Sequence, residues 1–371
     1  MSATLVSADD HVDLCYIPPN MWQERVSARH RDAAPKIEQT PKGAFWMREG
    51  RPWGNAGSRS GDGRKVVFDM TGVPEQPEPG VWRPTAPKYR LQDMDADGIA
   101  AQVIYNFLDW SFQDQALKTE CLAAYNSWLA EEFCPAAPNR LIGLATLPAH
   151  DPQAAAAELE RAARLGLKGA IFDVFSATLS IADPAWDRLW GVAAETGLPV
   201  SVHVGGGFHS AHKHIHEVPW GRAAAAGLFS MQLDEILSLV LMCGMLERHP
   251  KLKMVMGESG IGWIPYVMER IEFEIQNYAP MYPELLKRKG PRELFQRQVY
   301  ATFTDEILGT RMIPEIGVDN VLWAADYPHG DGSYPKSREV VERQFKGFSA
   351  ADRAKITSDN ARRIYGIPPL I

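Results

Sequence analysis

The chain has few cysteines, no long hydrophobic run and no excess of basic residues. It has four cysteines in 371 residues, and no two of them have the CxxC spacing of a zinc or redox motif. Scattered cysteines are typical of reduced thiols. The most apolar stretch, residues 236–246, is shorter than the roughly 20 residues that a membrane-spanning helix needs. We therefore expect a cytoplasmic protein without disulfides and without a membrane-spanning segment.

The charge balance excludes a further class of partner. The net charge is −7 and no block of lysine and arginine interrupts it, which argues against a nucleic-acid surface. Residues 1–7 have no basic segment followed by an apolar one, so we predict no signal peptide. Hydrophobic residues make up 45% of the chain, enough for a large buried core. The length fits one barrel domain with insertions, spanning residues 1–371.

Residues 32–90 differ in composition from the rest of the chain. They are rich in glycine, proline, arginine and tryptophan and show no sustained hydrophobic period. We interpret them as a long irregular insertion near the barrel mouth, because long loops of this kind usually serve a function or are disordered. Large aromatic side chains at Trp46, Trp53 and Trp82 favour a packed segment over a fully disordered one.

Short β-branched runs alternate with longer segments at helical spacing. The expected strands are Leu5–Ala8, Ala101–Tyr105, Ile142–Thr146, Gly169–Phe172, Pro199–Val204, Leu252–Met256, Val299–Phe303 and Val321–Ala324. The expected helices are Thr119–Cys134, Pro152–Leu165, Pro184–Thr196, Asp234–Arg248, Pro265–Asn277, Thr304–Ile316, Ser337–Lys346 and Ala350–Tyr365. Eight such repeats predict a (β/α)8 TIM barrel. An open doubly wound sheet is the alternative, and the lack of GxGxxG after the first strand weakens it.

Polar side chains follow three of the predicted strands. Asp9 and His11 end the first strand and face the same way, because side chains alternate along a strand. His203 ends the fifth strand and Asp326 the eighth. Each residue alone has an ordinary interpretation, as a helix cap, a hydrogen-bonded core histidine or a turn residue. Strand ends meet at one mouth of a barrel, so together the four predict a divalent metal site, with Zn²⁺ favoured and Mn²⁺ the alternative.

Several segments, in order from residue 7 to residue 366, give the chain a family resemblance. They are residues 7–12 (SADDHV), 166–170 (GLKGA), 202–203 (VH), 257–265 (GESGIGWIP), 323–329 (WAADYPH) and 360–366 (NARRIYG). This pattern resembles the amidohydrolase-related family, in the branch that includes aminocarboxymuconate-semialdehyde decarboxylase and the resorcylate and carboxyvanillate decarboxylases. The resemblance covers the chain apart from the insertion, and it implies the barrel fold more specifically than the reaction.

Three departures from the family pattern shape the prediction. Many superfamily members begin with HxH, whereas this chain has Asp9 before His11, and an acidic first residue also occurs among the decarboxylases of the branch. Two-metal members carry a lysine at the end of the fourth strand, but Lys168 lies at its beginning, which favours one metal ion. Several relatives place a histidine after the sixth strand, where this chain has Glu258. Glu258 is either an acid/base or a residue that only hydrogen-bonds a ligand.

The resemblance implies a reaction and a set of roles. We expect non-oxidative decarboxylation of an aromatic or unsaturated carboxylic acid, with Asp326 as the residue that protonates carbon. Relatives often form homodimers, and we carry this over as an expectation. For substrate binding we predict Arg51 in the insertion, which would clamp a carboxylate if it reached the mouth, and His329. His209, in a histidine-rich stretch that is either a mobile polar loop or a substrate contact, is the third candidate.

Two other functions are compatible with the sequence. The same ligand set would serve metal-assisted hydrolysis of an amide, a lactone or a carbon–carbon bond, because a bound metal ion lowers the pKa of water toward about 7. A barrel that only binds a small molecule is the non-enzymatic alternative. A non-enzymatic barrel would not explain why all four candidate metal ligands are present.

Overall fold

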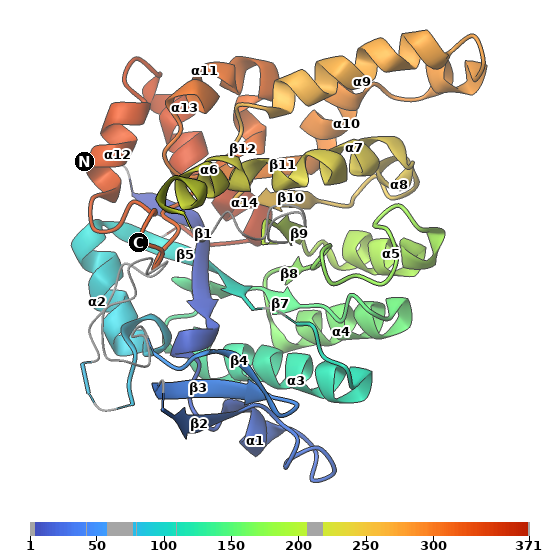
Figure 1. Ribbon diagram of the computed structural model, residues 1–371. Coiled ribbons are helices and arrows are strands. Elements are labelled where there is room, and N and C mark those ends of the chain that lie inside the picture. The colour runs from blue at the N-terminus through green and yellow to red at the C-terminus, as the bar shows by residue number, and fades with distance from the viewer. Residues whose placement is uncertain are drawn as a thin grey trace.

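The computed structural model describes residues 4–41, 43–57, 77–78, 80–108, 110–205 and 218–369. All eight expected barrel strands are present, with the expected strand Ile142–Thr146 divided into β6 and β7; neighbouring strands pair in parallel, and helices lie outside them (Figure 1). Their bounds are β1 Leu5–Asp13, β5 Ile99–Phe107, β6 Leu141–Gly143, β7 Ala145–Thr146, β8 Ala170–Ile171, β9 Val200–His203, β10 Met254–Gly257, β11 Val299–Phe303 and β12 Val321–Trp323. The predicted TIM-barrel fold is confirmed.

Strand pairing follows chain order and is interrupted at two places. One ladder runs β1-β5-β6, the other runs from β7 to β12, and Leu144 lies between β6 and β7. Within the described residues no ladder joins β12 to β1. The loop after β12 pairs with β1 instead: Asp326 N donates to Asp9 O at 3.0 Å and His11 N to Tyr327 O at 2.6 Å. These two hydrogen bonds connect β1 to the loop after β12 beside the candidate site.

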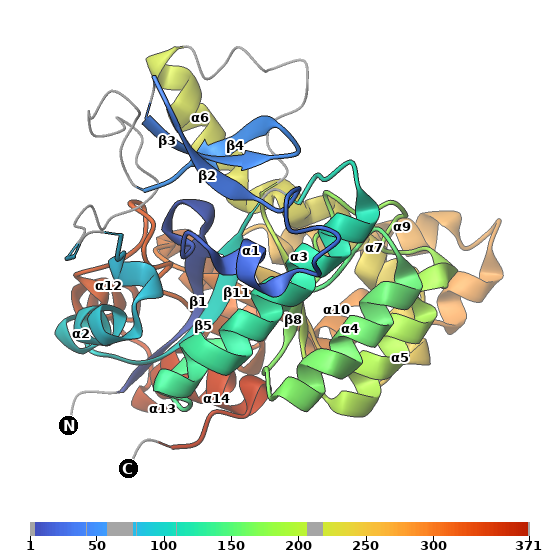
Figure 2. The ribbon, with the colours of Figure 1, turned by 90° about the horizontal axis from the view of Figure 1, so that it is seen from below.

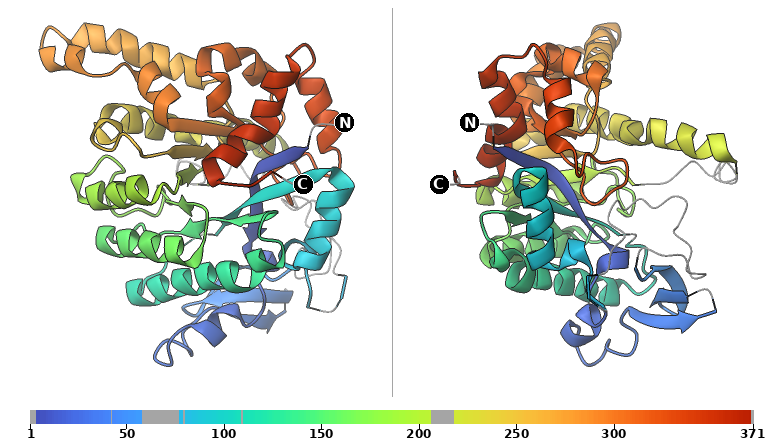
Figure 3. Two further views of the ribbon diagram at one scale, coloured as in Figure 1. Left: turned by 180° about the vertical axis from the view of Figure 1, so that it is seen from behind. Right: turned by 90° about the vertical axis from the view of Figure 1, so that its left-hand side faces the viewer.

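The helices pack around the outside of the strands (Figure 3). Their bounds are α1 Met21–Arg25, α2 Pro87–Asp97, α3 Gln115–Trp128, α4 Pro152–Leu165, α5 Asp187–Thr196, α6 Pro219–Phe229, α7 Asp234–Met242, α8 Met245–Arg248, α9 Ile264–Tyr278, α10 Pro291–Gln298, α11 Ile307–Ile316, α12 Ser337–Gln344, α13 Ala350–Ala354 and α14 Asn360–Tyr365. The expected helix Asp234–Arg248 is split into α7 and α8, because Gly244 takes a left-handed conformation with φ +85°. None of the described helices is long and apolar enough to cross a bilayer.

The core has two parts, one outside the strands and one within the barrel. The outer part joins the strands to the helices. The inner part consists of alternate strand residues such as Val6, Ala8 and Val103, as expected for a filled barrel. Residues of α14, among them Ile364 and Tyr365, pack onto this inner part.

The insertion at residues 32–90 is more regular than predicted. Strands β2 Lys36–Thr40, β3 Gly43–Arg48 and β4 Arg51–Asn55 form an antiparallel sheet beside α1 (Figure 2). Trp46 is fully buried, with its ring 5.0 Å from that of Trp22 in α1. The strands are short and mostly exposed on their other face, so their sequence shows little alternation. The expectation of a segment without secondary structure was therefore wrong for residues 36–55.

Candidate metal centre and active site

A bulge in β1 aims its acidic and histidine side chains into the barrel. The pairing of β1 with β5 shifts between Ser7 and Asp10. Val6, before the shift, and Ala8, within it, belong to the inner core, whereas Val12, after the shift, belongs to the outer core. An extra residue of this kind reverses which side chains point inward. Asp9 and His11 consequently face the barrel interior together.

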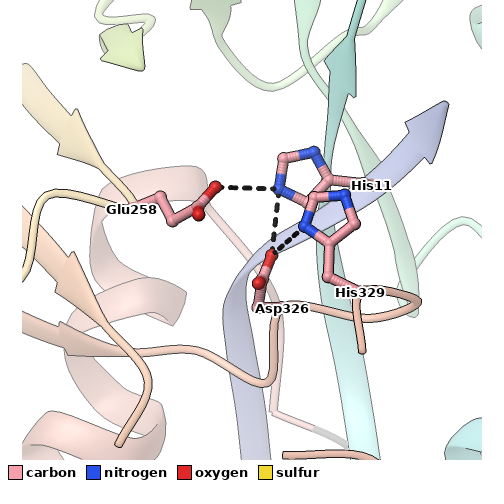
Figure 4. Close-up of side chains that lie close together, drawn as sticks. All are labelled: His11, Glu258, Asp326 and His329. Carbon is pink, nitrogen blue, oxygen red and sulfur yellow. Dashed lines mark ion pairs between the residues drawn. The ribbon is translucent and has the colours of Figure 1, made fainter. Parts of the chain in front are cut away.

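His11 lies at the centre of a buried cluster of carboxylates (Figure 4). Its Nε2 atom lies 3.1 Å from Asp326 Oδ1, 3.5 Å from Asp9 Oδ1 and 3.9 Å from Glu258 Oε2. The ring of His329 stacks on the ring of His11, with their centroids 4.2 Å apart. The predicted convergence of Asp9, His11 and Asp326 is thus present in the structure.

His203 joins the cluster from the end of β9. Its Nε2 atom lies 3.5 Å from Asp9 Oδ1 and 3.4 Å from Glu258 Oε2. Its Nδ1 atom lies 2.7 Å from the carbonyl oxygen of Val204, a contact that sets the ring orientation and places the proton on Nδ1. Nε2 is then the nitrogen that faces the cluster.

Gly257 leaves the space that the His203 ring occupies. A Cβ atom at residue 257 would lie 2.7 Å from His203 Cδ2 and 3.2 Å from Tyr105 Cε1. We expect Gly257→Ala to displace the imidazole and weaken metal affinity by about 10- to 100-fold, the range seen when the support of a ligand is lost. Metal titration of the purified variant measures this.

Gly191→Ala is the matched control for that substitution. It adds the same methyl group in α5, where the nearest side-chain atom is 3.7 Å away, at His249. The control should bind metal as the wild type does. Unchanged affinity in Gly257→Ala would show that the His203 ring is not held by this close contact.

The loop after β12 fixes Asp326 through hydrogen bonds to β1. Asp326 has a positive φ of +58°, a strained conformation for this residue type. On either side of it, Ala325 N donates to Ser7 Oγ at 2.7 Å and Tyr327 N donates to Asp10 Oδ1 at 3.0 Å. Neighbouring hydrogen bonds of this kind maintain strain at functional positions.

A buried arginine, Arg90, donates a hydrogen bond to the main chain of β1 next to the cluster. Arg90 Nη1 donates to the carbonyl oxygen of His11 at 2.7 Å, and its Nε donates to Gln102 Oε1 at 2.7 Å. Gln102 Nε2 in turn donates to Asp10 Oδ1 at 3.1 Å. This network fixes the main chain of β1 at the residue whose side chain is central to the site.

His329 lies between two carboxylates. Its Nδ1 atom is 3.0 Å from Asp326 Oδ1 and its Nε2 atom is 3.2 Å from Asp13 Oδ2. Asp13 is the third residue of the alternating Asp9-x-His11-x-Asp13 pattern and faces the same side of β1. The predicted contact of His329 with substrate stays a prediction, since both nitrogens already face acidic groups.

Glu258 is placed by a strained loop after β10. Its φ is +49°, and its amide N–H points to Asp9 Oδ2 at 2.8 Å. Further along the loop, the Glu306 carboxylate accepts from Ile261 N and Gly262 N, both at 2.8 Å. Glu306 thereby holds the loop that carries Glu258, a role that sequence reasoning missed.

Burial and neighbouring charges shift the acid–base properties of the cluster. Burial and the nearby Asp326 carboxylate raise the pKa of Glu258 well above its usual value. Burial would also raise the pKa of Asp326, but His329 and His11 hold that pKa below its usual value. Burial likewise opposes protonation of His203, yet Asp9 and Glu258 raise its pKa to about 9. The pKa values of Glu258 and Asp326 are therefore shifted in opposite directions, a common arrangement in acid–base catalysis.

The residues present fit a divalent cation. The ligand atoms of Asp9, His11 and His203 all lie within 4.8 Å of one another, and the same holds for His11, Glu258, Asp326 and His329. Asp9 Oδ1 and Glu258 Oε2 are buried and accept no hydrogen bond from the described residues. Such oxygens are costly to bury unless a cation or a donor satisfies them. Imidazole and carboxylate ligands suit Zn²⁺ and Mn²⁺.

The remaining predicted residues lie elsewhere. Arg51 is at the exposed start of β4, opposite Arg48 in the β3–β4 turn, and none of its described contacts reaches the cluster. His209 lies outside the described residues. Lys168 is exposed and precedes β8, so it does not reach the cluster side of that strand.

Comparison with known proteins agrees with this architecture. A gamma-resorcylate decarboxylase from Rhizobium sp. (strain MTP-10005) is 26% identical over 299 residues, covering 74% of this chain and 86% of the relative. An amidohydrolase structure from Mycobacterium avium subsp. paratuberculosis K-10 superposes with a TM-score of 0.77 at 20% identity, covering 99% of both chains. A dihydroxybenzoic acid decarboxylase from Polaromonas sp. JS666, solved with manganese and the inhibitor 2-nitroresorcinol, gives a TM-score of 0.65 at 19% identity, covering 99% of this chain and 98% of that one.

The family assignment rests on a wider match. The family model described as amidohydrolase matches residues 50–367, from β4 to the end of the described C-terminal helix, so that β1 with Asp9 and His11 lies before the matched part. That match covers well over half of the chain. The chain belongs to the amidohydrolase family.

Proposed function

We propose that the protein is a metal-dependent non-oxidative decarboxylase of an aromatic carboxylic acid. The observation that carries the proposal is the buried group of imidazole and carboxylate side chains around His11, which includes Glu258, a carboxyl group with a raised pKa. The gamma-resorcylate decarboxylases among the relatives support this reaction class for the chain. The predicted hydrolase would use the same ligands, and no observation at the site favours it.

Four residues would hold the metal ion: Asp9, His11, His203 and Asp326. Asp9 and His11 lie in β1, His203 is the last residue of β9, and Asp326 lies in the loop after β12. A single divalent ion, Zn²⁺ or Mn²⁺, would neutralise and orient the substrate carboxylate and a neighbouring oxygen. Rigid strand ends keep these side chains in place, which favours a fixed orientation of the bound acid.

The protein's own carboxyl groups would store the proton and deliver it to the ring carbon. When carbon dioxide leaves, the ring carbon must receive a proton in its place. Glu258, with its raised pKa, can hold that proton on its carboxyl group, whereas the lowered pKa of Asp326 suits an ionised carboxylate that would bind metal. Ligand atoms of the two residues lie within 4.8 Å of each other. We therefore assign proton delivery to this pair, with Glu258 as the group that stores the proton and Asp326 beside it.

A panel of aromatic acids tests the proposal. Metal-free protein is supplied with Mn²⁺ or Zn²⁺ and mixed with hydroxybenzoates that carry a hydroxyl group next to the carboxylate, and released carbon dioxide is measured. We expect release from at least one acid, dependent on added metal and abolished by a chelator. Metal-saturated protein that releases none from any member of the panel would refute the proposal.

A further inference from the structure

Thr302 lies within the barrel at the level of the metal-binding side chains. It belongs to β11, where Tyr300, two residues earlier, is part of the inner core, and Ala301 and Phe303 are part of the outer core. Alternation along the strand therefore points Thr302 inward, one layer above Tyr300. Its side chain is fully buried.

The Thr302 hydroxyl, the Asp9 carboxylate and the Glu258 amide form a group of three mutual hydrogen-bond contacts. It lies 2.8 Å from Asp9 Oδ2 and 2.6 Å from the amide nitrogen of Glu258, and that nitrogen is itself 2.8 Å from Asp9 Oδ2. An amide N–H can only donate, whereas a hydroxyl has one hydrogen and two lone pairs. Thr302 therefore accepts from Glu258 N and donates its own hydrogen to Asp9. The other acceptor near it, the Met256 carbonyl oxygen, is more distant at 3.5 Å.

These contacts distinguish the two oxygens of Asp9. Oδ2 receives the Thr302 hydroxyl and the Glu258 N–H, whereas Oδ1 accepts no hydrogen bond within the described residues. Oδ1 is also the oxygen that lies 3.5 Å from His11 Nε2 and 3.5 Å from His203 Nε2. Rotation of the carboxylate out of this orientation would break both hydrogen bonds to Oδ2.

We infer that Thr302 is a positioning residue that fixes the orientation of Asp9, with Oδ2 held by the protein and Oδ1 left for the metal ion that the cluster would hold. The inference rests on the proposed metal site. Hydrogen bonds to a coordinating carboxylate restrict its orientation, and their loss usually weakens metal affinity by about 10- to 100-fold. Because Glu258 N–H bridges the same two oxygens, Thr302 also links the metal ligand to the strained loop that carries Glu258.

Metal titration of apo variants tests the inference without any substrate. Thr302→Val keeps the shape of the side chain and removes the hydroxyl, and Thr302→Ser keeps the hydroxyl and removes the methyl group. Apo protein is titrated with Zn²⁺ and with Mn²⁺ against a chromophoric chelator. We expect Thr302→Val to bind about 10- to 100-fold more weakly than the wild type, and Thr302→Ser to retain wild-type affinity.

Thr357→Val controls for the loss of a buried hydroxyl as such. Thr357 is also fully buried, and its hydroxyl donates to the Arg353 carbonyl oxygen at 2.8 Å, within the helical segment before α14. This variant should bind metal normally, even if its thermal unfolding midpoint falls as far as that of Thr302→Val. If Thr302→Val does not fold, Thr302→Ala serves as the second hydroxyl-free variant, with the same expected loss.

Two results would overturn the inference. One is wild-type metal affinity in the hydroxyl-free variant, and the other is an equal loss of affinity in Thr302→Ser, which would assign the effect to packing. Because the titration contains no substrate, its result is independent of whether the chain decarboxylates any acid. Normal metal binding that depends on Thr302, together with no carbon dioxide release, would reject the proposed reaction and retain the role of Thr302.

Discussion

Replacing Asp326 with asparagine is expected to lower kcat for decarboxylation by about 10³-fold or more. Proton transfer by a positioned group contributes about 10²- to 10⁴-fold, and Asp326 would also lose its charge as a metal ligand. Its carboxylate lies 3.1 Å from His11 and 3.0 Å from His329, so the change affects two buried histidines as well. Steady-state kinetics at saturating metal, with metal content measured on the same sample, gives the result.

Asp331→Asn is the matched control for this prediction. Asp331 lies in the same loop after β12 and is exposed, so the same loss of charge occurs there outside the cluster. We expect wild-type kinetics from the control. Near-normal turnover by Asp326→Asn at full metal occupancy would contradict the role that we give to Asp326.

Glu258→Gln is expected to separate proton delivery from metal binding. Glutamine has the same shape as glutamate but cannot donate a carboxyl proton, so kcat should fall by about 10²- to 10⁴-fold. Four other residues would hold the metal, so its affinity should change much less than kcat. A large loss of affinity with unchanged kcat at saturating metal would make Glu258 a metal ligand instead of an acid.

Glu306→Gln is a useful comparison for the Glu258 variant. The amide oxygen of glutamine can replace only one of the two carboxylate oxygens that accept from Ile261 N and Gly262 N. The change therefore loosens the loop while leaving the Glu258 carboxyl group intact. We expect a smaller loss of kcat than in Glu258→Gln, because the proton donor remains. Equal losses would indicate that the Glu258 substitution acts only through the loop.

The barrel and the convergence of the four proposed ligands could be predicted because their signals are local. Strand-length runs of β-branched residues separated by helical segments define the order of elements, and the polar residues at strand ends then converge by geometry alone. The spatial convergence of Asp9, His11, His203 and Asp326 was predicted in this way, and their role as metal ligands stays a proposal. The bulge between Ser7 and Asp10 was not predicted, yet Asp9, which lies within it, and His11, which follows it, face the same cluster as expected.

Residues that act through contacts across the barrel were harder to find. Thr302 and Asp9 are 293 residues apart, and nothing in the sequence around a buried threonine distinguishes a ligand-orienting hydroxyl from a packing residue. Asp13 was detectable in principle, since it continues the alternation of Asp9 and His11. Glu306 follows β11 but accepts hydrogen bonds from backbone N–H groups of the loop after β10. A sequence pattern does not reveal such contacts between separate loops.

The small sheet at residues 36–55 was missed for a different reason. Its strands bury one face through a few tryptophans, among them Trp46, and leave most other side chains exposed or half-exposed. Glycine and proline within the segment also reduce its strand propensity. The aromatic residues indicated packing, but they did not reveal strand pairing.

The fate of isotopes in one turnover mixture tests the central claim most directly. The metal-loaded protein is incubated, in ¹⁸O-labelled D2O, with the aromatic acid that gives the highest activity, and the product is analysed by mass spectrometry and NMR. Decarboxylation predicts release of carbon dioxide and one solvent deuterium on the ring carbon that carried the carboxylate, with no ¹⁸O in the aromatic product. Incorporation of ¹⁸O into the organic product without carbon-bound deuterium would contradict decarboxylation and identify a hydrolase.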